Sequence, residues 1–580
     1  NSAHFRHSLI LEPKLGAYKM TKQLGASVLA DMLEAYGVTH VFFLPAVLRR
    51  MLREIERRTS IKRIHTRSEA GAAYMADGYA RVTGKPGICM AQIVGALNLC
   101  AGLRDAHLAK SPIIALTGGR EANHRDRWAY QEVDDLPAFA PYTKLNAAVD
   151  DPERLPDMLR QAFRAATTGC PGPVHLQLAG NSGQVIDNSE INFDGVVEPQ
   201  FGQVPPDRPQ PDPDQIRKAV DRIALAERPV IVAGAGTKMS GAYDALNKLA
   251  DSMEIPVATS LAAKDAILED SVLSVGVVGT YSRRSANQVV ASADLVIFVG
   301  TRAGGMTTHF WTMPPKGTAT IQIDIDPSVN GRNYPNDVSI VGDARVCLEK
   351  MSEINVPVPR SRARWLEEVR IICSSYKEDY SDVYHSRAVP IRPERIVHEL
   401  SEAMPENAIV VVDTGHSGMW MGGMFEMRWK NQTYIRSSGH LGWAFPAAIG
   451  AKCGAPERPV VCFTGDLGFW YHMAELETAV RCKVKTITVI NNNNSGNQAL
   501  RTTKKLYDDE LTARVDEMFP RSKDNFAKIA EDMGAIGIRV EDPDEIKAAF
   551  ERALQEKQPV VIDIVSDIEV VAPLAWEKPE

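Results

Sequence analysis

The sequence lacks the features that would place it in several large classes of protein. Its eight cysteines form no CxxC pair, which argues against a zinc ribbon or a disulfide framework and favours a reduced, cytoplasmic setting. No uninterrupted apolar run is long enough to cross a bilayer, so no membrane partner is expected. The net charge of −7 comes without a basic excess, so no nucleic-acid partner is expected either. What is present is an ordinary globular composition in 580 residues, too many for one hydrophobic core.

The first 19 residues also lack the long apolar core of a signal peptide. Met20 is followed directly by "TKQLGASVLADMLEAYGV", an amphipathic pattern that predicts a helix. We therefore expect residues 1–19 to be an N-terminal extension outside the fold.

Strand-like and helix-like segments alternate along almost the whole chain, a pattern typical of α/β domains with parallel sheets. Proline-bearing stretches at 199–215 and 356–365 divide this pattern into three blocks. We predict three doubly wound parallel-sheet domains, at residues 20–190, 207–355 and 385–575. Ligands of such sheets lie beyond the carboxyl ends of the strands, so the residues that follow each strand are the candidates for function.

Two strand ends in the third block carry the chemistry of a metal site. The segment "PVVCFTGD" ends in Gly465 and Asp466, and the next strand, "VKTITVI", runs into four asparagines, Asn491 to Asn494. If both strands belong to one parallel sheet, the carboxylate and the amide oxygens meet at the same edge, where they suit Mg²⁺ or Ca²⁺. Spacing alone leaves an alternative open, in which Asp466 only caps a helix and the asparagines form a loop.

The Gly-Asp pair followed by Asn-Asn resembles the diphosphate-binding motif of thiamine-diphosphate-dependent enzymes. Residues 20–575 as a whole resemble the group of these enzymes that includes acetolactate synthase, benzoylformate decarboxylase and oxalyl-CoA decarboxylase. The resemblance implies that the three domains are, in chain order, pyrimidine-binding, central and diphosphate-binding. It also implies that the side chains of Asp466 and Asn493 and the backbone carbonyl of Ser495 hold the metal. Leu467 departs from the small residue that the family usually has after the aspartate.

A second segment, "IHTRSEAGAAYMADGYARVTGKPG", is similar to the stretch that carries the family's activating glutamate, and the match puts that residue at Glu69. A carboxyl group against N1′ of the aminopyrimidine promotes the imino tautomer, whose N4′ then removes the C2 proton of the thiazolium to give the ylid. An isolated glutamate at this place would more simply cap a helix or lie on its surface. The assignment of Glu69 as catalytic therefore rests on the resemblance.

The resemblance further implies which residues hold the rest of the cofactor. Loops of the third block would contact the diphosphate or the aminopyrimidine, Leu441 would keep the cofactor bent, and the Gly439 carbonyl would accept from N4′. Taken alone, Leu441 could equally be an ordinary core residue. The full cofactor-binding set is Glu69, Gly415, His416, Met419, Gly439, Leu441, Gly465, Asp466, Leu467, Gly468, Asn493 and Ser495.

Substrate contacts are expected from loops of the first block, where this chain departs from the family pattern. Ala46-Val47 and Ile93-Val94 stand where the family usually has other, mostly smaller residues, so a bulkier and more apolar pocket is expected. Gln131, in "AYQEVDD", is the candidate hydrogen-bond partner of a substrate carbonyl or carboxylate, or else a polar residue at a helix start. His472 is a candidate proton relay near neutral pH, or else a packing residue.

Together these features predict a thiamine-diphosphate- and Mg²⁺-dependent (or Ca²⁺-dependent) enzyme similar to acetolactate synthase, a decarboxylase or carboligase acting on a 2-keto acid. It would make or break a carbon–carbon bond next to a carbonyl through a C2 ylid. The first alternative is a CoA-linked enzyme with an acyl-CoA substrate, such as a 2-hydroxyacyl-CoA lyase or an oxalyl-CoA decarboxylase. The second is a non-catalytic homologue. FAD in the central domain is left open but not predicted, and a homodimer or homotetramer with active sites at the dimer interface is implied.

Overall fold

The structure is a computed structural model that describes residues 21–520 and 523–576, so the predicted extension at 1–19 lies outside the described residues. Three six-stranded parallel sheets, each accompanied by helices, make up most of it. The predicted class, α/β with three parallel-sheet domains, is therefore confirmed, whereas the exact domain boundaries stay predictions. None of the described helices is long and apolar enough to span a membrane.

The N-terminal sheet has the strand order β3-β2-β4-β5-β7-β6. Its strands are β2 (His40–Phe43), β3 (Lys62–His65), β4 (Gly87–Ala91), β5 (Ile113–Gly118), β6 (Leu145–Val149) and β7 (Val174–Leu178), and β1 (Thr21–Leu24) pairs with β8 (Glu190–Phe193) beside it. Its helices are α1 (Gly25–Ala35), α2 (Arg49–Arg58), α3 (Glu69–Thr83), α4 (Ala96–Ala109), α5 (Leu136–Phe139), α6 (Leu155–Thr167) and α7 (Gln184–Asn188). Strands β4 and β5 are buried along their whole length, as expected of a sheet covered on both faces.

The C-terminal sheet repeats the same order, β16-β15-β17-β18-β20-β19. Its strands are β15 (Ile409–Val412), β16 (Thr433–Arg436), β17 (Val460–Gly465), β18 (Ile487–Asn492), β19 (Ile536–Val540) and β20 (Val560–Val565). Its helices are α14 (Pro393–Ala403), α15 (His416–Met424), α16 (Ala444–Gly454), α17 (Asp466–His472), α18 (Glu475–Arg481), α19 (Asn497–Leu506), α20 (Phe526–Asp532) and α21 (Ile546–Gln555). Chain order reverses between β15 and β17, which makes the loops after these strands the natural ligand site.

The central sheet differs, with the order β11-β10-β9-β12-β13-β14. Its strands are β9 (Pro229–Ala233), β10 (Val257–Thr259), β11 (Ser274–Val277), β12 (Leu295–Val299), β13 (Ala319–Asp324) and β14 (Val338–Val341). Its helices are α8 (Pro213–Leu225), α9 (Ala235–Met239), α10 (Tyr243–Met253), α11 (Arg284–Ser292) and α12 (Ala344–Ser352), and α13 (Ser361–Tyr384) leads to the C-terminal domain. This is the strand order of dinucleotide-binding sheets. Here the loops after β9 and β12 pack directly on each other, as shown by the overlap that a Cβ on Gly234 would have with the Gly300 carbonyl.

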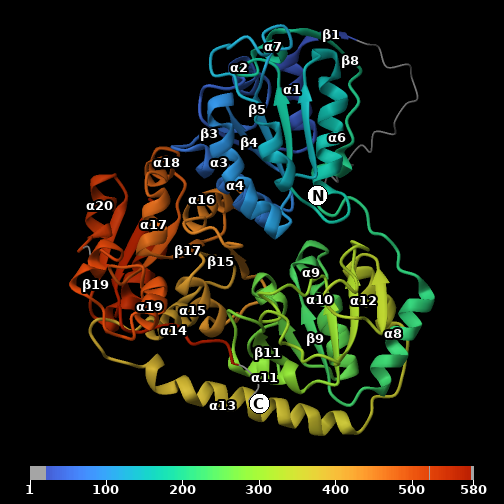
Figure 1. The fold of residues 1–580 in the computed structure, drawn as a ribbon, viewed down its shortest axis with the longest axis vertical. Helices are drawn as coiled ribbons and strands as arrows, with labels where there is room; N and C mark the ends of the chain where they lie inside the picture. The colour runs from blue at the N-terminus through green and yellow to red at the C-terminus, as the bar shows by residue number, and fades with distance from the viewer. Residues whose placement is uncertain (1–20, 521–522, 577–580) are drawn as a thin grey trace, which may run out of the picture.

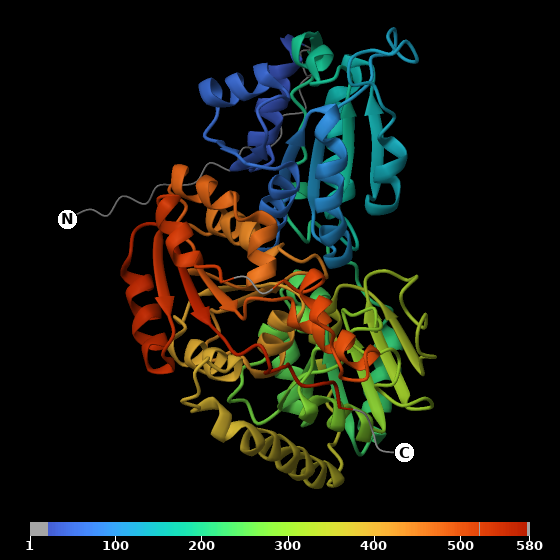
Figure 2. The ribbon, with the colours of Figure 1, turned by 60° about the vertical axis from the view of Figure 1, so that its left-hand side comes forward.

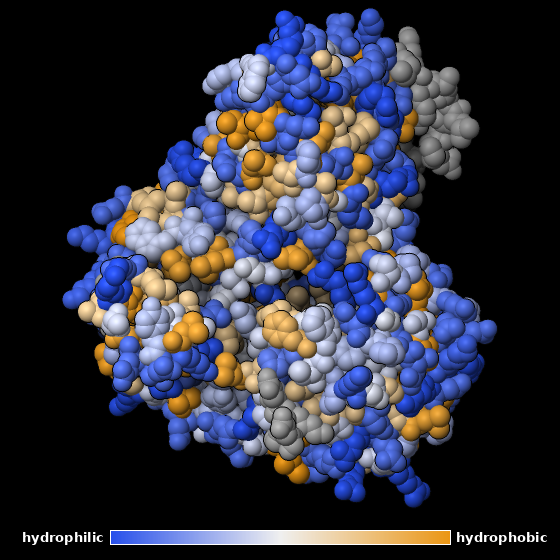
Figure 3. Space-filling view, in the orientation of Figure 1, coloured by the Kyte–Doolittle hydropathy of each residue, from blue (hydrophilic) through white to orange (hydrophobic). Residues whose placement is uncertain are grey.

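The three domains are arranged as a triangle. In Figure 1 the N-terminal domain lies above the other two, and α13 runs beneath both of these as a single long helix. Figure 2 shows the same arrangement from a second direction. In the space-filling view of Figure 3 the surface is hollowed where the N-terminal domain meets the lower two, and apolar side chains lie around this hollow. The predicted functional loops belong to the N-terminal and C-terminal domains, which meet here.

Helices α3 and α16 make the closest contact between the N-terminal and C-terminal domains. A Cβ on Gly78 would overlap the carbonyl of Ala447, and a Cβ on Gly450 would overlap the carbonyl of Met75. Residues of both helices belong to one buried apolar cluster. The glycines thus let two backbones approach more closely than any other residue would allow.

Candidate active site

Four loops of the C-terminal domain meet at one edge of its sheet, and each follows the carboxyl end of a strand. Strands β17 and β18 are parallel neighbours in a register that pairs Gly465 with Asn491. Asp466 therefore lies beside the asparagine run, as the sequence predicted. The loops after β15 and β16, which carry Gly415 and Gly439, complete the group.

Asp466 and Asn493 are brought together by the backbone of Ser495. The N–H of Ser495 lies 3.1 Å from Asp466 Oδ2 and 3.1 Å from Asn493 Oδ1, so both oxygens face the same amide. Asp466 is 7% exposed, and burial raises its pKa to about 6. A buried carboxylate beside amide oxygens is the donor set of a hard cation such as Mg²⁺ or Ca²⁺.

Several buried polar atoms at this edge have no hydrogen-bond partner in the described part of the chain. They are Ser495 Oγ, Asn491 Oδ1, Asn494 Oδ1 and His416 Nε2. Buried polar groups are rarely left unpaired in a folded protein, because each one costs about 1–3 kcal/mol. Such a concentration is expected where a polar ligand and its cation bind, so the residues fit a metal–diphosphate site.

The N-terminus of α15 contacts helix α19, which follows the asparagine run in the chain. Gly415 has a φ of +68°, and a Cβ there would lie 2.9 Å from Gln498 Oε1, so glycine is required. His416 Nδ1 lies 2.6 Å from Asn497 Oδ1, and the amide of Gln498 lies 4.0 Å from the Met419 sulfur. Burial lowers the pKa of His416 to about 4, which makes the ring neutral at pH 7. Asn497 was not among the predicted residues, and its only signal was its place after the asparagine run.

Gly468, another predicted residue of this domain, lies against Asp413, which the sequence reasoning missed. Asp413 is fully buried, and it accepts hydrogen bonds from Gly442 N–H at 3.0 Å and from Thr464 Oγ1 at 2.9 Å. A Cβ on Gly468 would lie 2.7 Å from its Oδ2. Burial raises the pKa of Asp413 to about 7. The motif "DTG" after β15 was the available signal, but only the contacts show that this carboxylate joins the loops after β15, β16 and β17.

Glu69 lies in the N-terminal domain, as the first residue of α3. Ser68 caps the helix by accepting the N–H of Gly71 at 2.9 Å, and Asn98 Nδ2 donates to Glu69 Oε2 at 3.3 Å. Glu475 of the C-terminal domain, 1% exposed, accepts the N–H groups of both Arg67 and Ser68. The position of Glu69 is thus set by the other domain as well, through a residue that no local pattern singled out.

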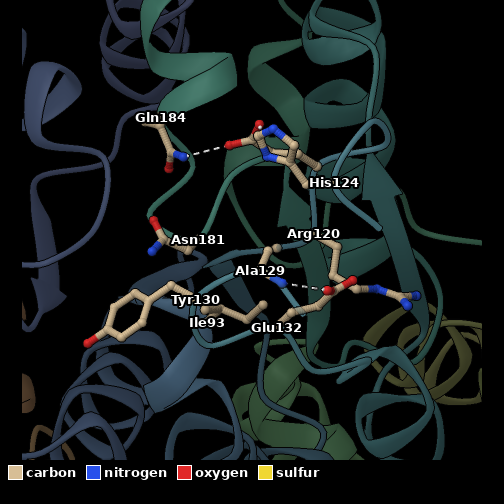
Figure 4. Close-up of a pocket in the computed structure, with 10 residues that line it drawn as sticks. Ile93, Arg120, His124, Ala129, Tyr130, Glu132, Asn181 and Gln184 are labelled. Atoms are coloured by element: carbon tan, nitrogen blue, oxygen red, sulfur yellow. Dashed lines mark hydrogen bonds and ion pairs between the residues drawn. The ribbon is translucent and has the colours of Figure 1, made fainter. Parts of the chain in front are cut away.

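A cavity of about 160 Å³ opens in the N-terminal domain at Ile93, which belongs to the turn Ile93–Gly95 that packs against Glu69 (Figure 4). It is lined by Ile93, Gly119, Arg120, Glu121, His124, Ala129, Tyr130, Glu132, Asn181 and Gln184. In Figure 4, Gln184 donates to Glu121, and the carboxylate of Glu132 accepts the N–H of Ala129. Gln131 lies between two lining residues, at a φ of +63°, and its buried Oε1 has no partner in the described chain.

The unusual segment after Asp466 is only partly buried. Leu467, Trp470 and Tyr471 are 46%, 42% and 61% exposed, so these apolar side chains lie on the surface of the single chain. His472 packs edge-on against Tyr74 of α3 at 5.2 Å between ring centroids. Burial lowers the pKa of His472 to about 4, so its ring is neutral near pH 7. This favours a packing role over a relay that titrates near neutral pH, and the relay stays a prediction.

Comparison with known proteins identifies the class to which this fold and site belong. Models of the thiamine pyrophosphate enzyme family match its N-terminal TPP-binding domain at 24–138, its central domain at 216–351 and its C-terminal TPP-binding domain at 413–564. These matches cover more than half of the chain and include strands of all three sheets. The chain belongs to the thiamine pyrophosphate (thiamine diphosphate) enzyme family.

Individual relatives match along nearly the whole chain. A probable acetolactate synthase large subunit from Methanocaldococcus jannaschii is 34% identical over 94% of this chain and 92% of its own length. One from Methanococcus aeolicus is 32% identical over the same shares. The acetolactate synthase large subunit of Parasynechococcus marenigrum is 32% identical over 93% of this chain and 87% of its own length. The chain is similar to these proteins in all three domains.

Proposed function

We propose that this protein is a thiamine-diphosphate- and Mg²⁺-dependent carboligase or decarboxylase of 2-keto acids, similar to acetolactate synthase. The observation that carries the proposal is the convergence of Asp466, Asn493 and Ser495 at one sheet edge, among buried polar atoms without partners. The names of the relatives support a 2-keto acid as substrate. The presence of Glu69 together with this edge argues against a non-catalytic homologue.

Each part of the site has a role in this proposal. Asp466 Oδ, Asn493 Oδ1 and the Ser495 carbonyl would hold Mg²⁺ or Ca²⁺, and the loops at 415–419 and 465–468 would hold the diphosphate. Gly439 and Leu441 would contact the aminopyrimidine. Glu69 would hold a proton against the pyrimidine ring. When bound, thiamine diphosphate would supply an electron sink next to the substrate carbonyl.

The cavity beside Glu69 is the proposed substrate pocket. Gln131, whose Oε1 lacks a partner, would orient the substrate from the cavity wall through its amide. His472 packs against Tyr74 rather than lining this cavity, and it would act as a proton relay near pH 7 only if a ligand raised its pKa. Ile93, one of the residues from which a bulkier and more apolar pocket is expected, lines this cavity, and the comparison with relatives stays a prediction. We further propose a cytoplasmic homodimer or homotetramer.

Replacing Glu69 tests the mechanism. Glu69→Gln should lower turnover of a 2-keto acid by roughly 10²- to 10⁴-fold, the usual worth of a general acid–base group, while cofactor affinity stays within a few-fold. Asp466→Ala should instead abolish Mg²⁺-dependent cofactor binding, measured by fluorescence titration. Glu153→Gln, an exposed glutamate of the same domain, is the matched control and should behave like wild type. Full activity of Glu69→Gln would sink the proposal.

A panel of substrates distinguishes the proposed 2-keto acid reaction from the CoA-linked alternative. Pyruvate and longer 2-keto acids, alone and in pairs, should yield CO₂ with a hydroxyketone or an aldehyde, identified by mass spectrometry. Turnover of oxalyl-CoA or a 2-hydroxyacyl-CoA, with no turnover of free 2-keto acids, would replace the proposal by the CoA-linked alternative.

A further inference from the structure

The loop after β16, residues 437–443, is held by two buried carboxylates from different domains. Asp413 of the C-terminal domain accepts the N–H of Gly442, as described above. Asp105 of the N-terminal domain, on α4, accepts the N–H of Ser438 at 2.9 Å and that of His440 at 3.2 Å. The N–H groups of this loop therefore point toward carboxylates in the protein interior.

Asp105 is itself fixed by its neighbours and fully buried. Arg81 of α3 donates to Asp105 Oδ1 at 2.8 Å and to the backbone carbonyl of Arg436, the last residue of β16, at 2.6 Å. Arg81 also pairs with Asp77, and its guanidinium lies 4.3 Å from the ring centroid of Trp443. Both oxygens of Asp105 thus accept from several donors, which fixes the orientation of its carboxylate.

Gly439 lies between Ser438 and His440, the two residues whose N–H groups Asp105 accepts. Its φ is +142°, a conformation open to glycine, and its N–H donates to Ser437 Oγ at 3.1 Å. Ser437 Oγ lies 3.1 Å from Asp105 Oδ2. Among the described residues no donor reaches the Gly439 carbonyl oxygen, so this acceptor is available to a ligand.

We infer that Asp105 is a positioning residue, through which the N-terminal domain holds the Gly439 carbonyl in place for the aminopyrimidine of the cofactor. The inference rests on the proposed function, because the ligand of that carbonyl is the one proposed above. Asp105 touches neither substrate nor cofactor; it acts through Ser437, Ser438 and His440.

The same two helices that carry this contact also carry Glu69. Helix α3 begins at Glu69 and bears Arg81, and α4 bears both Asn98, which donates to Glu69, and Asp105. Tyr74 of α3 adds a hydrogen bond of 2.5 Å to His440 Nδ1. Helices α3 and α4 therefore connect Glu69 with the Gly439 loop within one chain, so a shift of either helix would disturb both.

Asp105→Asn is the direct test. The NH₂ of the new asparagine faces hydrogen-bond donors in both of its orientations. In one it faces Arg81 and Ser438 N–H, and in the other it faces His440 N–H, so the loop must shift. In holoenzyme with Mg²⁺ we expect loss of the near-ultraviolet circular dichroism band of the bound aminopyrimidine tautomer. The exchange of the cofactor C2 proton for deuterium should slow roughly 10- to 100-fold, the worth of a hydrogen bond to a charged group. Cofactor affinity should change less than about threefold, since the metal edge is untouched.

Asp187→Asn is the matched control. Asp187 is a buried carboxylate of the same domain that accepts the N–H groups of Arg50 and Met51 at 2.7 and 2.8 Å, away from the Gly439 loop. It should lower thermal stability but leave the band and the exchange rate unchanged. Ser437→Ala removes the hydroxyl that links Asp105 to Gly439 N–H and that also contacts the His440 carbonyl at 2.7 Å. It serves if Asp105→Asn does not fold and should weaken the same signals.

The outcomes separate the inference from the function on which it rests. The inference alone is overturned if the wild type shows the circular dichroism band and the C2 proton exchange and Asp105→Asn keeps both within twofold of wild type. Equal loss in Asp187→Asn overturns it too, because the effect would then be general destabilisation. A wild-type protein that shows neither signal with cofactor and Mg²⁺ overturns the proposed function, and the inference falls with it.

Discussion

Buried histidines of this protein are of two kinds, and their hydrogen bonds tell them apart. His416 leaves Nε2 unpaired at the proposed cofactor edge. His175, fully buried in the N-terminal domain, is completely paired: Nδ1 lies 2.8 Å from Asn146 Oδ1 and Nε2 lies 2.7 Å from Thr117 Oγ1. Its ring also stacks on Phe139 at 3.7 Å. A paired ring in a closed core stabilises the fold, whereas an unpaired one at a sheet edge indicates a ligand.

His175 should make the stability of this protein depend on pH. Burial lowers its pKa to about 3, so the unfolded chain binds a proton below its ordinary pKa and the folded chain does not. The contribution of His175 to the free energy of unfolding is therefore fully present above pH ~6.5. It decreases as the pH falls, by about 2 kcal/mol at pH ~5. His175→Gln should be less stable than wild type at pH ~8 by about 1–3 kcal/mol, and the difference should shrink toward pH ~5. Thermal melts at the two pH values check this, and a constant difference would contradict it.

At the scale of elements, the crossing of α3 and α16 decides how the first and third domains meet. Gly78 and Gly450 allow backbone to approach backbone, and Trp443 donates to Asp77 at 2.9 Å beside them. The contact also places α3, which begins at Glu69, against the domain that holds Asp466. The glycines therefore serve the arrangement of the site as well as stability.

Gly450→Ala tests this crossing. The added methyl would overlap the carbonyl of Met75, so the helices must separate, at a cost of about 1–3 kcal/mol or more. A decrease in melting temperature of several degrees is expected, since ~1 kcal/mol shifts a domain of this size by about 2–4 °C. Gly304→Ala is the control, because a Cβ on Gly304 meets nothing within 4 Å and its φ is not positive. Equal melting temperatures for the two variants would refute the role of the crossing.

At the scale of the whole molecule, the central domain holds the helix that leads to the proposed diphosphate site. Three groups donate to the last carbonyls of α15: Lys264 Nζ to Gly422 at 2.9 Å, and Arg283 Nε and Tyr376 OH to Gly423 at 2.7 and 2.9 Å. Cations are favourable at this end of a helix because of its dipole. The central domain, without a predicted ligand of its own, thus supports the cofactor helix from behind.

Arg283→Met should weaken this attachment. The change removes Arg283 Nη1, from which both oxygens of Glu269 accept, and leaves this partly buried carboxylate with Lys377 Nζ at 3.3 Å. The cost should therefore be less than about 3–5 kcal/mol, the cost of a buried charge left unpaired. Calorimetry should show a lower and broader unfolding transition as the central domain separates from the C-terminal one. Arg284→Gln, the next residue, breaks an exposed ion pair with Asp379 and an exposed hydrogen bond to Ser375 Oγ, and should cost less than about 1 kcal/mol. If both variants melt alike, the central domain does not support α15 in this way.

Local sequence was sufficient for much of the site. Glycine and aspartate at a strand end predicted that Asp466 lies beside the asparagine run, and the structure places it there. The helix start at Ser68 belongs to the alternative interpretation of the Glu69 segment, and the catalytic role of Glu69 stays a prediction that rests on the resemblance. Asp413, Glu475 and Asp105 were not predicted. Glu475, for example, contacts Arg67 across 408 residues of chain, and no pattern near either residue signals that contact.

By itself the sequence determined the three α/β domains and the residue types at the strand ends, because strand and helix periodicities and terminal residues are local properties of the chain. Only the tertiary structure decided the strand orders, alike in the first and third sheets and different in the central one. It also decided which carboxylates orient the Gly439 loop. The physical reason is that strand neighbours and buried hydrogen bonds are selected by packing between distant segments, which no local pattern encodes.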